Sequence, residues 1–324
     1  MSDPMVSVIV PIYNAEKYIS ATLKSLLNQT LNELEYLLVD DCSTDSTINV
    51  IESVLEDFPK RKNQVTIIRN RSNLGAGQSR NVGIENSHGT YVIFCDSDDL
   101  VDLDAYESML KLAVESDADM VTCGMKINNK ECLFLDVKTL SLASLQKYEC
   151  LEGGIYSSSC NKMVKRSLIL ENNIRFAQNI RMWDDLYFTF QLRYFCSNDV
   201  ILDKALYNYL YVNSGSITRA DVDKKVESQV QCVKLIETFL NQKYDVSRYE
   251  GAIRFLKLRS KDSFFTFENK ERWRLIYPES HNKMYKYLRY YGLKRIILFY
   301  LYAYSNIGVV SKILELYSKY KGEN

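Results

Sequence analysis

The chain has 324 residues, of which 46% are hydrophobic and 25% are charged. With only 12 glycines and 4 prolines, it has the composition of a globular protein with a sizeable core, which excludes collagen-like, mucin-like and disordered chains. The length corresponds to about two domains, or to one domain with a long extension. Two histidines, His88 and His281, argue against a multi-histidine zinc site and against a Ser-His-Asp triad.

The formal charge is zero, but the two ends of the chain differ in sign. Residues 1–120 hold 9 Lys/Arg and 20 Asp/Glu, whereas residues 243–324 hold 17 Lys/Arg, 8 Asp/Glu and 12 of the 24 tyrosines. Such an asymmetry is typical of a chain that separates a metal or substrate site from a surface that meets an anionic partner.

The eight cysteines include no C-x-x-C pair, and several lie inside apolar runs. No signal peptide precedes the first strand-like run. We therefore expect reduced thiols and a cytoplasmic location rather than a disulfide framework.

Strand and helix patterns alternate over the first 125 residues. Short apolar runs predict strands at Val6–Val10, Glu35–Val39, Val65–Arg69, Tyr91–Cys95 and Met120–Cys123. Amphipathic spacing predicts helices over about Ala15–Gln29, Ser46–Phe58, Gly77–Asn86 and Ala105–Ser116. Continuous apolar strands that alternate with helices are typical of a parallel sheet covered on both faces. We therefore predict an α/β fold with a mostly parallel central sheet flanked by helices.

The pattern loosens after residue 125. Residues 126–160 mix short strand-like runs with polar segments, and helices are predicted near 165–171 and 184–196. From about residue 221 the chain is mostly helical and rich in Lys, Arg and Tyr. We predict one domain over residues 1–220, with halves of about 5–125 and 126–220, followed by a helical region over 221–324.

Polar residues follow the ends of three predicted strands, where open α/β sheets bind their ligands. These residues are Pro11, Tyr13 and Asn14; Asp40 and Asp41; and Asp96, Asp98 and Asp99. Three aspartates within four positions repel one another unless a cation neutralises them. Hard oxygen ligands of this kind suit Mg²⁺ or Mn²⁺ that also binds a phosphate. The sequence therefore predicts a metal and phosphate site after the fourth strand.

Four segments occur in this order at ordinary spacings: SVIVPIYNAEKYI (Ser7–Ile19), LVDDCSTDST (Leu38–Thr47), NLGAGQSRNVGI (Asn73–Ile84) and GTYVIFCDSDDL (Gly89–Leu100). Together they resemble the nucleotide-sugar-binding half of the family 2 glycosyltransferases, which have the GT-A fold. The resemblance covers about residues 5–125 closely and continues more weakly to about residue 215. It implies a UDP-sugar donor and Mn²⁺ or Mg²⁺ as cofactor.

The resemblance implies roles for the residues that follow the first two strands. In the P-x-Y-N segment, Tyr13 would stack on the uracil, beside Pro11 and Asn14. Asp41 would accept a hydrogen bond from uracil N3–H, and Asp40 would brace the loop.

The D-x-D of the family corresponds to Asp96 and Asp98. Asp96 would reach the ribose and the metal, Asp98 would ligate the metal that bridges the diphosphate, and Asp99 would orient the donor sugar. Asn73, with Gly75 and Gly77, resembles a loop that closes over the donor. Arg80, near the head of the next helix, either neutralises a phosphate or pairs with the aspartates, and both interpretations remain open.

A second acidic pair lies at the start of a predicted helix, in the segment Met182–Phe188 (MWDDLYF). Asp185 matches the family's general base, which takes the proton of the acceptor hydroxyl. Asp184 replaces the usual glutamate, and Trp183 would form the floor of the acceptor site. The alternative is that both acids only favour a helix N-terminus.

The segment Cys160–Arg166 (CNKMVKR) resembles the W-N-K-L-Y-K-R segment of the family, with Cys160 in place of the tryptophan. Lys162 would approach the donor phosphates on the acceptor side, or would stand at a solvated helix start. The segment Asn213–Thr218 (NSGSIT) resembles a loop that closes the catalytic domain.

The last predicted helices carry many tyrosines beside Lys286, Arg289, Lys294 and Arg295. The apolar run Ile296–Val310 is shorter than the about 20 residues of a membrane-spanning helix. Three interpretations remain open: peripheral membrane docking, a tyrosine-rich helical bundle, and a helix-mediated oligomer. No recognition motif for nucleic acid is present.

The sequence therefore predicts an inverting, metal-dependent hexosyl- or N-acetylhexosaminyl-transferase that moves a sugar from a UDP-sugar to a sugar hydroxyl. The resemblance implies a glycan or lipid-linked oligosaccharide acceptor at the inner face of a bacterial plasma membrane, in capsule, O-antigen or exopolysaccharide synthesis. Two alternatives are a nucleotidyltransferase and a catalytically silent sugar-nucleotide-binding subunit of an assembly complex.

Overall fold

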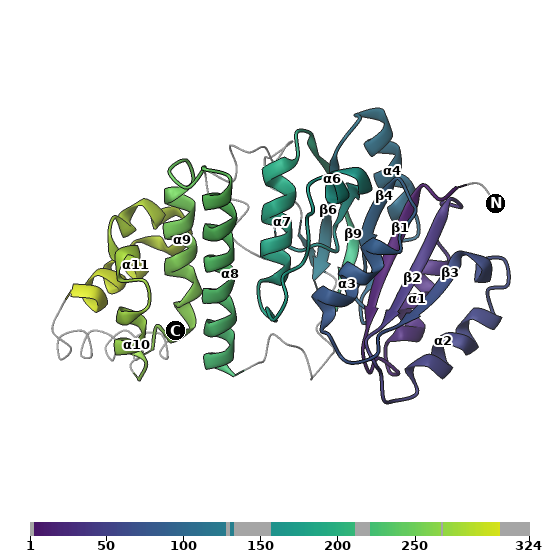
Figure 1. The fold of residues 1–324 in the computed structure, drawn as a ribbon, viewed down its shortest axis with the longest axis horizontal. Helices are drawn as coiled ribbons and strands as arrows, with labels where there is room; N and C mark the ends of the chain where they lie inside the picture. The colour runs from purple at the N-terminus through teal and green to yellow at the C-terminus, as the bar shows by residue number, and fades with distance from the viewer. Residues whose placement is uncertain (1–2, 128–129, 133–156, 211–220, 267, 305–324) are drawn as a thin grey trace. The chain divides into compact units, whose positions relative to one another are not determined.

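The computed structural model describes residues 3–127, 130–132, 157–210, 221–266 and 268–304. The chain divides into two compact units, Met1–Arg219 and Ala220–Asn324 (Figure 1).

The first unit is built on one sheet, which contains nine strands among the described residues. The strands are β1 (Val6–Ile12), β2 (Leu34–Asp40), β3 (Val65–Arg69), β4 (Tyr91–Phe94), β5 (Leu100–Val101), β6 (Met120–Ile127), β7 (Lys130–Cys132), β8 (Lys162–Lys165) and β9 (Asp199–Tyr209). Their order is β3-β2-β1-β4-β8-β6-β9-β5, with β7 paired to β6. The longest ladders, β1–β2 and β6–β9, are parallel, and the short strands β5, β7 and β8 pair antiparallel. The predicted α/β fold is confirmed.

Helices cover this sheet (Figure 1). They are α1 (Ile19–Leu27), α2 (Thr47–Glu56), α3 (Ala76–Glu85), α4 (Ala105–Glu115), α6 (Arg166–Glu171) and α7 (Asp184–Phe195). Helix α1 begins four residues later than predicted. The N–H of Ala15, which precedes the helix, donates to Thr47 Oγ1 (2.8 Å) at the start of α2. This bond links the segment after β1 to the start of α2.

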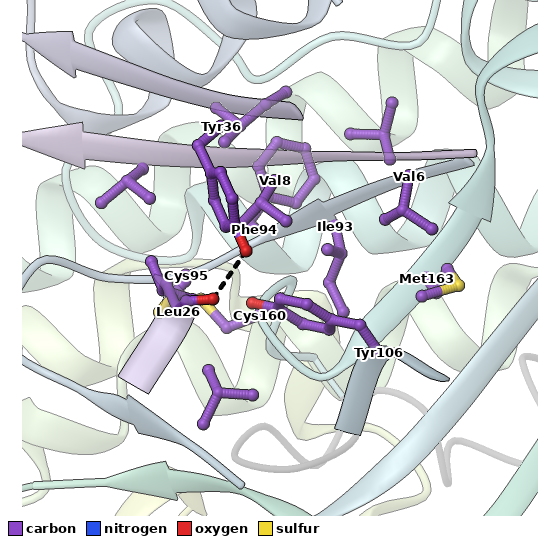
Figure 2. Packing of buried hydrophobic residues seen from close by; sticks show 14 of the residues in the cluster. Val6, Val8, Leu26, Tyr36, Ile93, Phe94, Cys95, Tyr106, Cys160 and Met163 are labelled. Carbon is purple, nitrogen blue, oxygen red and sulfur yellow. Dashed lines mark hydrogen bonds between the residues drawn. The ribbon is translucent and has the colours of Figure 1, made fainter. Parts of the chain in front are cut away.

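The core of the first unit lies around β1, whose seven residues are all buried. Figure 2 shows part of this packing, including the hydroxyl of Tyr36, which donates to the carbonyl of Leu26 (2.6 Å). Helix α3 lies directly on β1, since a Cβ at Gly83 would overlap the side chain of Ile9. The close contact at Gly83 fixes the position of Arg80, one turn earlier on the same helix.

Two details of the predicted strands were wrong. Strand β1 does not end at Pro11 but includes it, buried, opposite Val39 of β2. The ladder between β1 and β4 already ends at Ile9. The proline is tolerated because no hydrogen bond to β4 is needed at its position, where it lacks an N–H. Strand β9, which the sequence analysis missed, is exposed at Asp203 and Lys204, and this interrupts the apolar pattern that identifies a buried strand.

The second unit is helical, which confirms the predicted helical C-terminal region. Its helices are α8 (Val222–Gln242), α9 (Glu250–Ser260), α10 (Lys270–Leu275) and α11 (Leu288–Tyr304), with 3₁₀ turns η5 (Asp262–Phe264), η6 (Pro278–His281) and η7 (Met284–Tyr287). Trp273 is fully buried and contacts the rings of Phe265, Phe299 and Tyr302. These aromatic side chains form the core of a helical bundle. A tyrosine-rich bundle is one of the three interpretations that the sequence analysis left open for this region.

No helix in the part of the chain that the structure describes is both long and apolar enough to cross a membrane. The segment Asn213–Thr218 and the end of the apolar run Ile296–Val310 lie outside the described residues. Cys42, Cys95, Cys123, Cys160 and Cys196 are free thiols, as expected.

Candidate active site

The ends of β1 and β2 are linked by a polar loop contact that leaves Tyr13 in solvent. The N–H of Asn14 donates to Ser43 Oγ (3.0 Å), and Asn14 Oδ1 accepts from the N–H of Thr44 (2.8 Å). Asn14 has a φ of 48°, in the left-handed region that asparagine tolerates better than most residues. The Tyr13 side chain is 49% exposed, so its ring is open to a planar ligand, whereas Asn14 holds the loop.

Asp40 and Asp41 are both buried, and they hold different parts of the chain. Asp40 Oδ1 accepts from the N–H of Ser43 (3.1 Å), which confirms that it braces this loop. Asp41 accepts from the N–H groups of Leu74 (2.8 Å) and Gly75 (2.7 Å) and from Asn70 Nδ2 (2.8 Å). The structure does not support the uracil contact predicted for Asp41, because its carboxylate is only 2% exposed and anchors the loop before α3.

The loop before α3 is shaped by this anchor. Gly75 has a φ of +88°, which favours glycine, and Asn73 is exposed on the loop. A Cβ at Gly77 would lie 3.2 Å from Phe176 Cβ, so α3 packs closely against that residue. Pro11, which the sequence analysis placed in the nucleotide-sugar site beside Tyr13, is buried in β1.

The turn after β4 separates its three aspartates. The side chain of Asp96 is 31% exposed and Asp98 is half-buried, whereas Asp99 is buried. Asp99 accepts from Tyr207 Oη (2.6 Å) and from the N–H of Leu210 (2.8 Å). Burial and the neighbouring Asp96 raise the pKa of Asp99 to about 8. Asp99 therefore fixes the turn to β9, and its predicted role in orienting a donor sugar is not supported.

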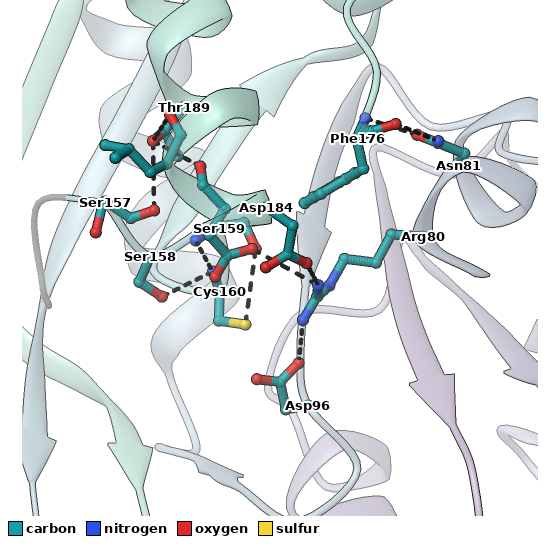
Figure 3. Close-up of polar contacts among 12 residues, drawn as sticks. Arg80, Asn81, Asp96, Ser157, Ser158, Ser159, Cys160, Phe176, Asp184 and Thr189 are labelled. Atoms are coloured by element: carbon teal, nitrogen blue, oxygen red, sulfur yellow. Dashed lines mark hydrogen bonds and ion pairs between the residues drawn. The ribbon is translucent and has the colours of Figure 1, made fainter. Parts of the chain in front are cut away.

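Arg80 lies between the two acidic clusters that the sequence analysis singled out (Figure 3). One guanidinium nitrogen lies 2.6 Å from Asp96 Oδ1, and the other lies 3.3 Å from Asp184 Oδ2 and 3.6 Å from Asp185 Oδ1. Of the two interpretations left open for Arg80, pairing with the aspartates is the one observed. Burial lowers the pKa of the guanidinium, but the three carboxylates raise it more, so it lies above its usual value.

Asp184 and Asp185 are the first two residues of α7, where the helix dipole favours negative charge. Their side chains are 19% and 29% exposed. Burial and the charge of Asp185 raise the pKa of Asp184 to about 7, and Arg80 opposes this shift. Trp183, half-buried, precedes them with a φ of +68°, which is a strained conformation for a bulky residue.

Lys162 does not lie where the resemblance implied. It is fully buried on β8, and its Nζ donates to the carbonyl of Ser158 (2.6 Å) and to Asn161 Oδ1 (2.8 Å). Burial and the nearby Arg193 lower the pKa of Lys162 to about 7. Lys162 is therefore neither at a solvated helix start nor directed toward donor phosphates.

The sequence analysis missed three residues that hold the site together. Ser159 donates its hydroxyl to Asp185 Oδ1 (2.9 Å), and Tyr207 Oη accepts from the N–H of Asp96 (3.1 Å). The backbone of Phe176 is bound by Asn81 (2.9 and 3.0 Å), and its ring lies 5.2 Å from the guanidinium carbon of Arg80. Ser159 directly precedes the segment Cys160–Arg166, and that position is a signal by which it could have been predicted to lie in the site. No periodicity in the sequence identifies Phe176 or Tyr207.

The residues of this site fit a divalent cation only in combination with a ligand. Within the described ranges, no group of three or more His, Cys, Asp or Glu side chains could hold a metal ion by itself. The network of three carboxylates and one guanidinium nevertheless has a formal excess of two negative charges, with Asp98 nearby on the turn. Two carboxylates on a partly open turn suit a hard cation that takes its other ligands from phosphate and water.

The model of the family "Glycosyl transferase family 2" matches residues 7–171, about half of the chain. The chain belongs to this family. EpsH of Bacillus subtilis, named as a glycosyltransferase, is 30% identical over 262 residues, which are 77% of this chain and 73% of EpsH. TarS of Staphylococcus aureus, a poly(ribitol-phosphate) beta-N-acetylglucosaminyltransferase, is 28% identical over 79% of this chain, and the match spans 47% of TarS.

Solved structures confirm the GT-A fold. The crystal structure of S. aureus TarS 1–349 in complex with UDP-GlcNAc superposes with a TM-score of 0.69 at 22% identity, over 97% of this chain and 91% of that one. A mannosyltransferase of Pyrobaculum calidifontis, in complex with GDP-Man and Mn²⁺, has a TM-score of 0.59 at 17% identity, over 99% and 83% of the chains. Family membership favours sugar transfer from a nucleotide sugar over the nucleotidyltransferase alternative.

Proposed function

We propose that this protein is an inverting, metal-dependent glycosyltransferase that moves a hexosyl or N-acetylhexosaminyl group from a UDP-sugar to a sugar hydroxyl. One observation carries the proposal. Arg80 contacts both Asp96, of the acidic turn after β4, and the Asp184–Asp185 pair at the start of α7. The residues that we assign to the diphosphate site and to the general base thus share one guanidinium. A direct displacement at a sugar carbon requires the base and the leaving diphosphate to lie close to the same carbon, and this arrangement brings the two sets of residues together.

In this proposal Asp185 removes the proton from the acceptor hydroxyl while the oxygen attacks the anomeric carbon. A sugar hydroxyl is a poor nucleophile, and a positioned base contributes about 10²–10⁴-fold to such a step. A single displacement inverts the configuration at that carbon. The partial exposure of Asp185 allows an acceptor to reach it. Trp183, two residues earlier in the chain, would contact an acceptor sugar.

On the donor side, Tyr13 supplies an exposed ring for the uracil, and Asp96 and Asp98 would hold Mn²⁺ or Mg²⁺. When bound, the metal would stabilise the charge of the departing diphosphate. Two relatives give support: structures of TarS 1–349 contain UDP or UDP-GlcNAc, and the P. calidifontis enzyme contains GDP-Man and Mn²⁺. The name of TarS also favours an N-acetylhexosaminyl donor.

The acceptor that we propose is a glycan or lipid-linked oligosaccharide at the cytoplasmic face of the plasma membrane, in capsule, O-antigen or exopolysaccharide synthesis. The surface of α11 supports membrane contact. After the break at Gly292, Leu293, Ile297 and Tyr304 are 64%, 49% and 61% exposed and share one helix face by their spacing. Lys286 and Lys294 are exposed nearby in sequence, as for a helix that lies on an anionic surface.

The test is the Asp185→Asn variant, assayed with UDP-sugars and saccharide acceptors in Mn²⁺. We expect UDP affinity to stay within about twofold and turnover to fall by about 10²–10⁴-fold. Asp104→Asn is the matched control, because Asp104 caps α4 away from this site. Near-wild-type turnover of Asp185→Asn would mean that the acidic pair only starts a helix, and UDP binding without transfer by the unaltered protein would favour the silent subunit.

A further inference from the structure

The carboxylate of Asp185 is held by one residue of the segment that leads into β8. Ser159 donates its hydroxyl to Asp185 Oδ1 (2.9 Å), and its backbone N–H points to Asp185 Oδ2 at a longer distance (3.4 Å). The Ser159 side chain is buried, at 1% exposure. A buried hydroxyl that faces a partly exposed carboxylate restricts the rotation of that carboxylate.

The segment that carries Ser159 is itself fixed from two sides, of which Figure 3 shows the side of Thr189. The buried Nζ of Lys162 holds the carbonyl of Ser158 (2.6 Å), and Asn161 Nδ2 donates to the carbonyl of Cys123 on β6 (2.8 Å). On α7, Thr189 donates to the carbonyl of Ser157 (3.3 Å) or of Asp185 (2.8 Å), one turn from the acidic pair. Lys162, which does not face the donor, therefore helps to fix the support of Asp185.

We propose that Ser159 is a positioning residue, which orients the Asp185 carboxylate through its side-chain hydroxyl so that Oδ2 faces the acceptor hydroxyl. This inference rests on the proposed function, in which Asp185 is the base. The two oxygens of Asp185 are not equivalent. Oδ1 receives the short bond from Ser159 and lies 3.6 Å from Arg80. Among the described residues, the bond to Oδ2 is the long one from the Ser159 N–H, which leaves Oδ2 the better proton acceptor.

The experiment compares kcat and KM of Ser159→Ala with those of the unaltered protein, per folded molecule. We expect kcat to fall about tenfold because the base loses its orientation. We expect KM for the donor to change less than about twofold. A residue that only stabilised the fold would lower the melting temperature and leave kcat per folded molecule unchanged.

Two further variants complete the test. Ser159→Thr keeps the hydroxyl and should restore most of kcat; if it does not fold, Ser159→Ala alone decides. Ser108→Ala removes a serine–aspartate bond on α4 (3.0 Å) and should change neither kcat nor KM.

The outcomes separate this inference from the function on which it rests. An inactive Asp185→Asn variant together with an unchanged kcat in Ser159→Ala would overturn only the role of Ser159. Near-wild-type turnover of Asp185→Asn would remove both the base and its positioning residue.

Discussion

Each of the two units buries a long cationic side chain, and the surroundings of the two differ in kind. In the first unit, Arg80 is 5% exposed and contacts the carboxylates of Asp96, Asp184 and Asp185. In the second, Lys261 is fully buried and its direct contacts are with neutral groups, while the charge of Glu279 acts on it without a direct contact. Its Nζ lies 2.6 and 3.2 Å from the carbonyls of Ile276 and Tyr277, 2.7 Å from His281 Nε2 and 4.4 Å from the ring of Trp273.

The difference changes the charge state of each cation. The carboxylates keep Arg80 charged and raise its pKa, whereas burial lowers the pKa of Lys261 to about 7. The partners of Arg80 are 19–31% exposed, so a bound anion or cation can compete for them. The partners of Lys261 are main-chain and ring atoms that tie η6 to the end of α9. The comparison distinguishes a charged network available for chemistry from a polar cross-link within a core.

The sharpest test of this distinction is Arg80→Met, which removes the charge and keeps most of the length. Without the guanidinium, three carboxylates face one another, and we expect turnover to fall by about 100-fold or more. Arg61→Met is the control, since Arg61 bonds the carbonyls of Gln29 (2.5 Å) and Leu31 (2.9 Å) instead of carboxylates. It should lower the melting temperature while the rate per folded molecule stays near that of the unaltered protein. Initial rates and thermal unfolding of both variants measure this, and an active Arg80→Met would reduce Arg80 to a packing residue.

A second test separates two neighbouring acids of the same turn. Asp98→Asn removes a proposed metal ligand, and we expect Mn²⁺-dependent UDP affinity to fall by about 10–100-fold or more. Asp99→Asn alters a carboxylate that only holds Tyr207 and the N–H of Leu210, so UDP affinity should stay within about threefold. Titration calorimetry with and without Mn²⁺ measures both. Equal affinities for Asp98→Asn and the unaltered protein would exclude Asp98 as a metal ligand.

How much of the fold could be predicted from the sequence depends on whether a strand is buried or partly exposed. Strands β1, β2 and β4 are almost continuously buried, as in a sheet that helices cover on both faces, and the predicted runs match them closely. Strand β3 is an edge strand and only partly buried, and its predicted run also matches. Strand β9 has exposed polar residues at Asp203 and Lys204 in its middle, so periodicity does not identify it. Parallel pairing of β9 with β6 depends on contacts distant in sequence.

The candidate site was predictable only as residue types at strand and helix ends. The patterns of Asp96, Asp98 and Asp185 could be recognised, and the structure brings Asp96 and Asp185 to one guanidinium. Which way a side chain points could not be read from the pattern. Asp41, Asp99 and Lys162 look like ligand-binding residues in the sequence, yet each is buried and bonded to the chain's own groups.

The second unit is also distinguished by the exposed apolar face of α11, whose opposite face is core. Phe299 and Tyr302 are buried, so removal of the helix would unfold the unit, and point changes are the better test. We expect Leu293→Glu/Ile297→Glu to lower binding to anionic vesicles by about tenfold, and binding of the unaltered protein to weaken with salt.

Leu103→Glu, at a leucine that is 58% exposed in the first unit, is the control and should bind vesicles normally. Sedimentation with vesicles and size-exclusion chromatography measure the effects. A change of oligomeric state by the double variant, with no lipid binding by the unaltered protein, would replace the membrane proposal with a helix-mediated oligomer.

The smallest expected effect concerns the pH dependence that follows from Lys261. Its folded-state pKa is lowered to about 7, so between about pH 7 and 9 the unfolded chain binds more protons than the folded one, and stability must rise with pH. Because the two carbonyls favour the charged amine, we expect a rise of only about 1–2 kcal/mol in the free energy of unfolding of the second unit. Lys261→Met should abolish this rise.

Lys257, one turn earlier on α9, is the matched control because it pairs with Glu237 (2.7 Å) and Glu279 (2.9 Å), which raise its pKa. Lys257→Met should therefore keep the slope. The two tryptophans lie in different units, so denaturation followed by Trp273 fluorescence in a Trp183→Phe background reports on the second unit. A slope unchanged by Lys261→Met would mean that Lys261 stays charged in the fold, and Arg80 and Lys261 would then differ in their partners but not in their charge.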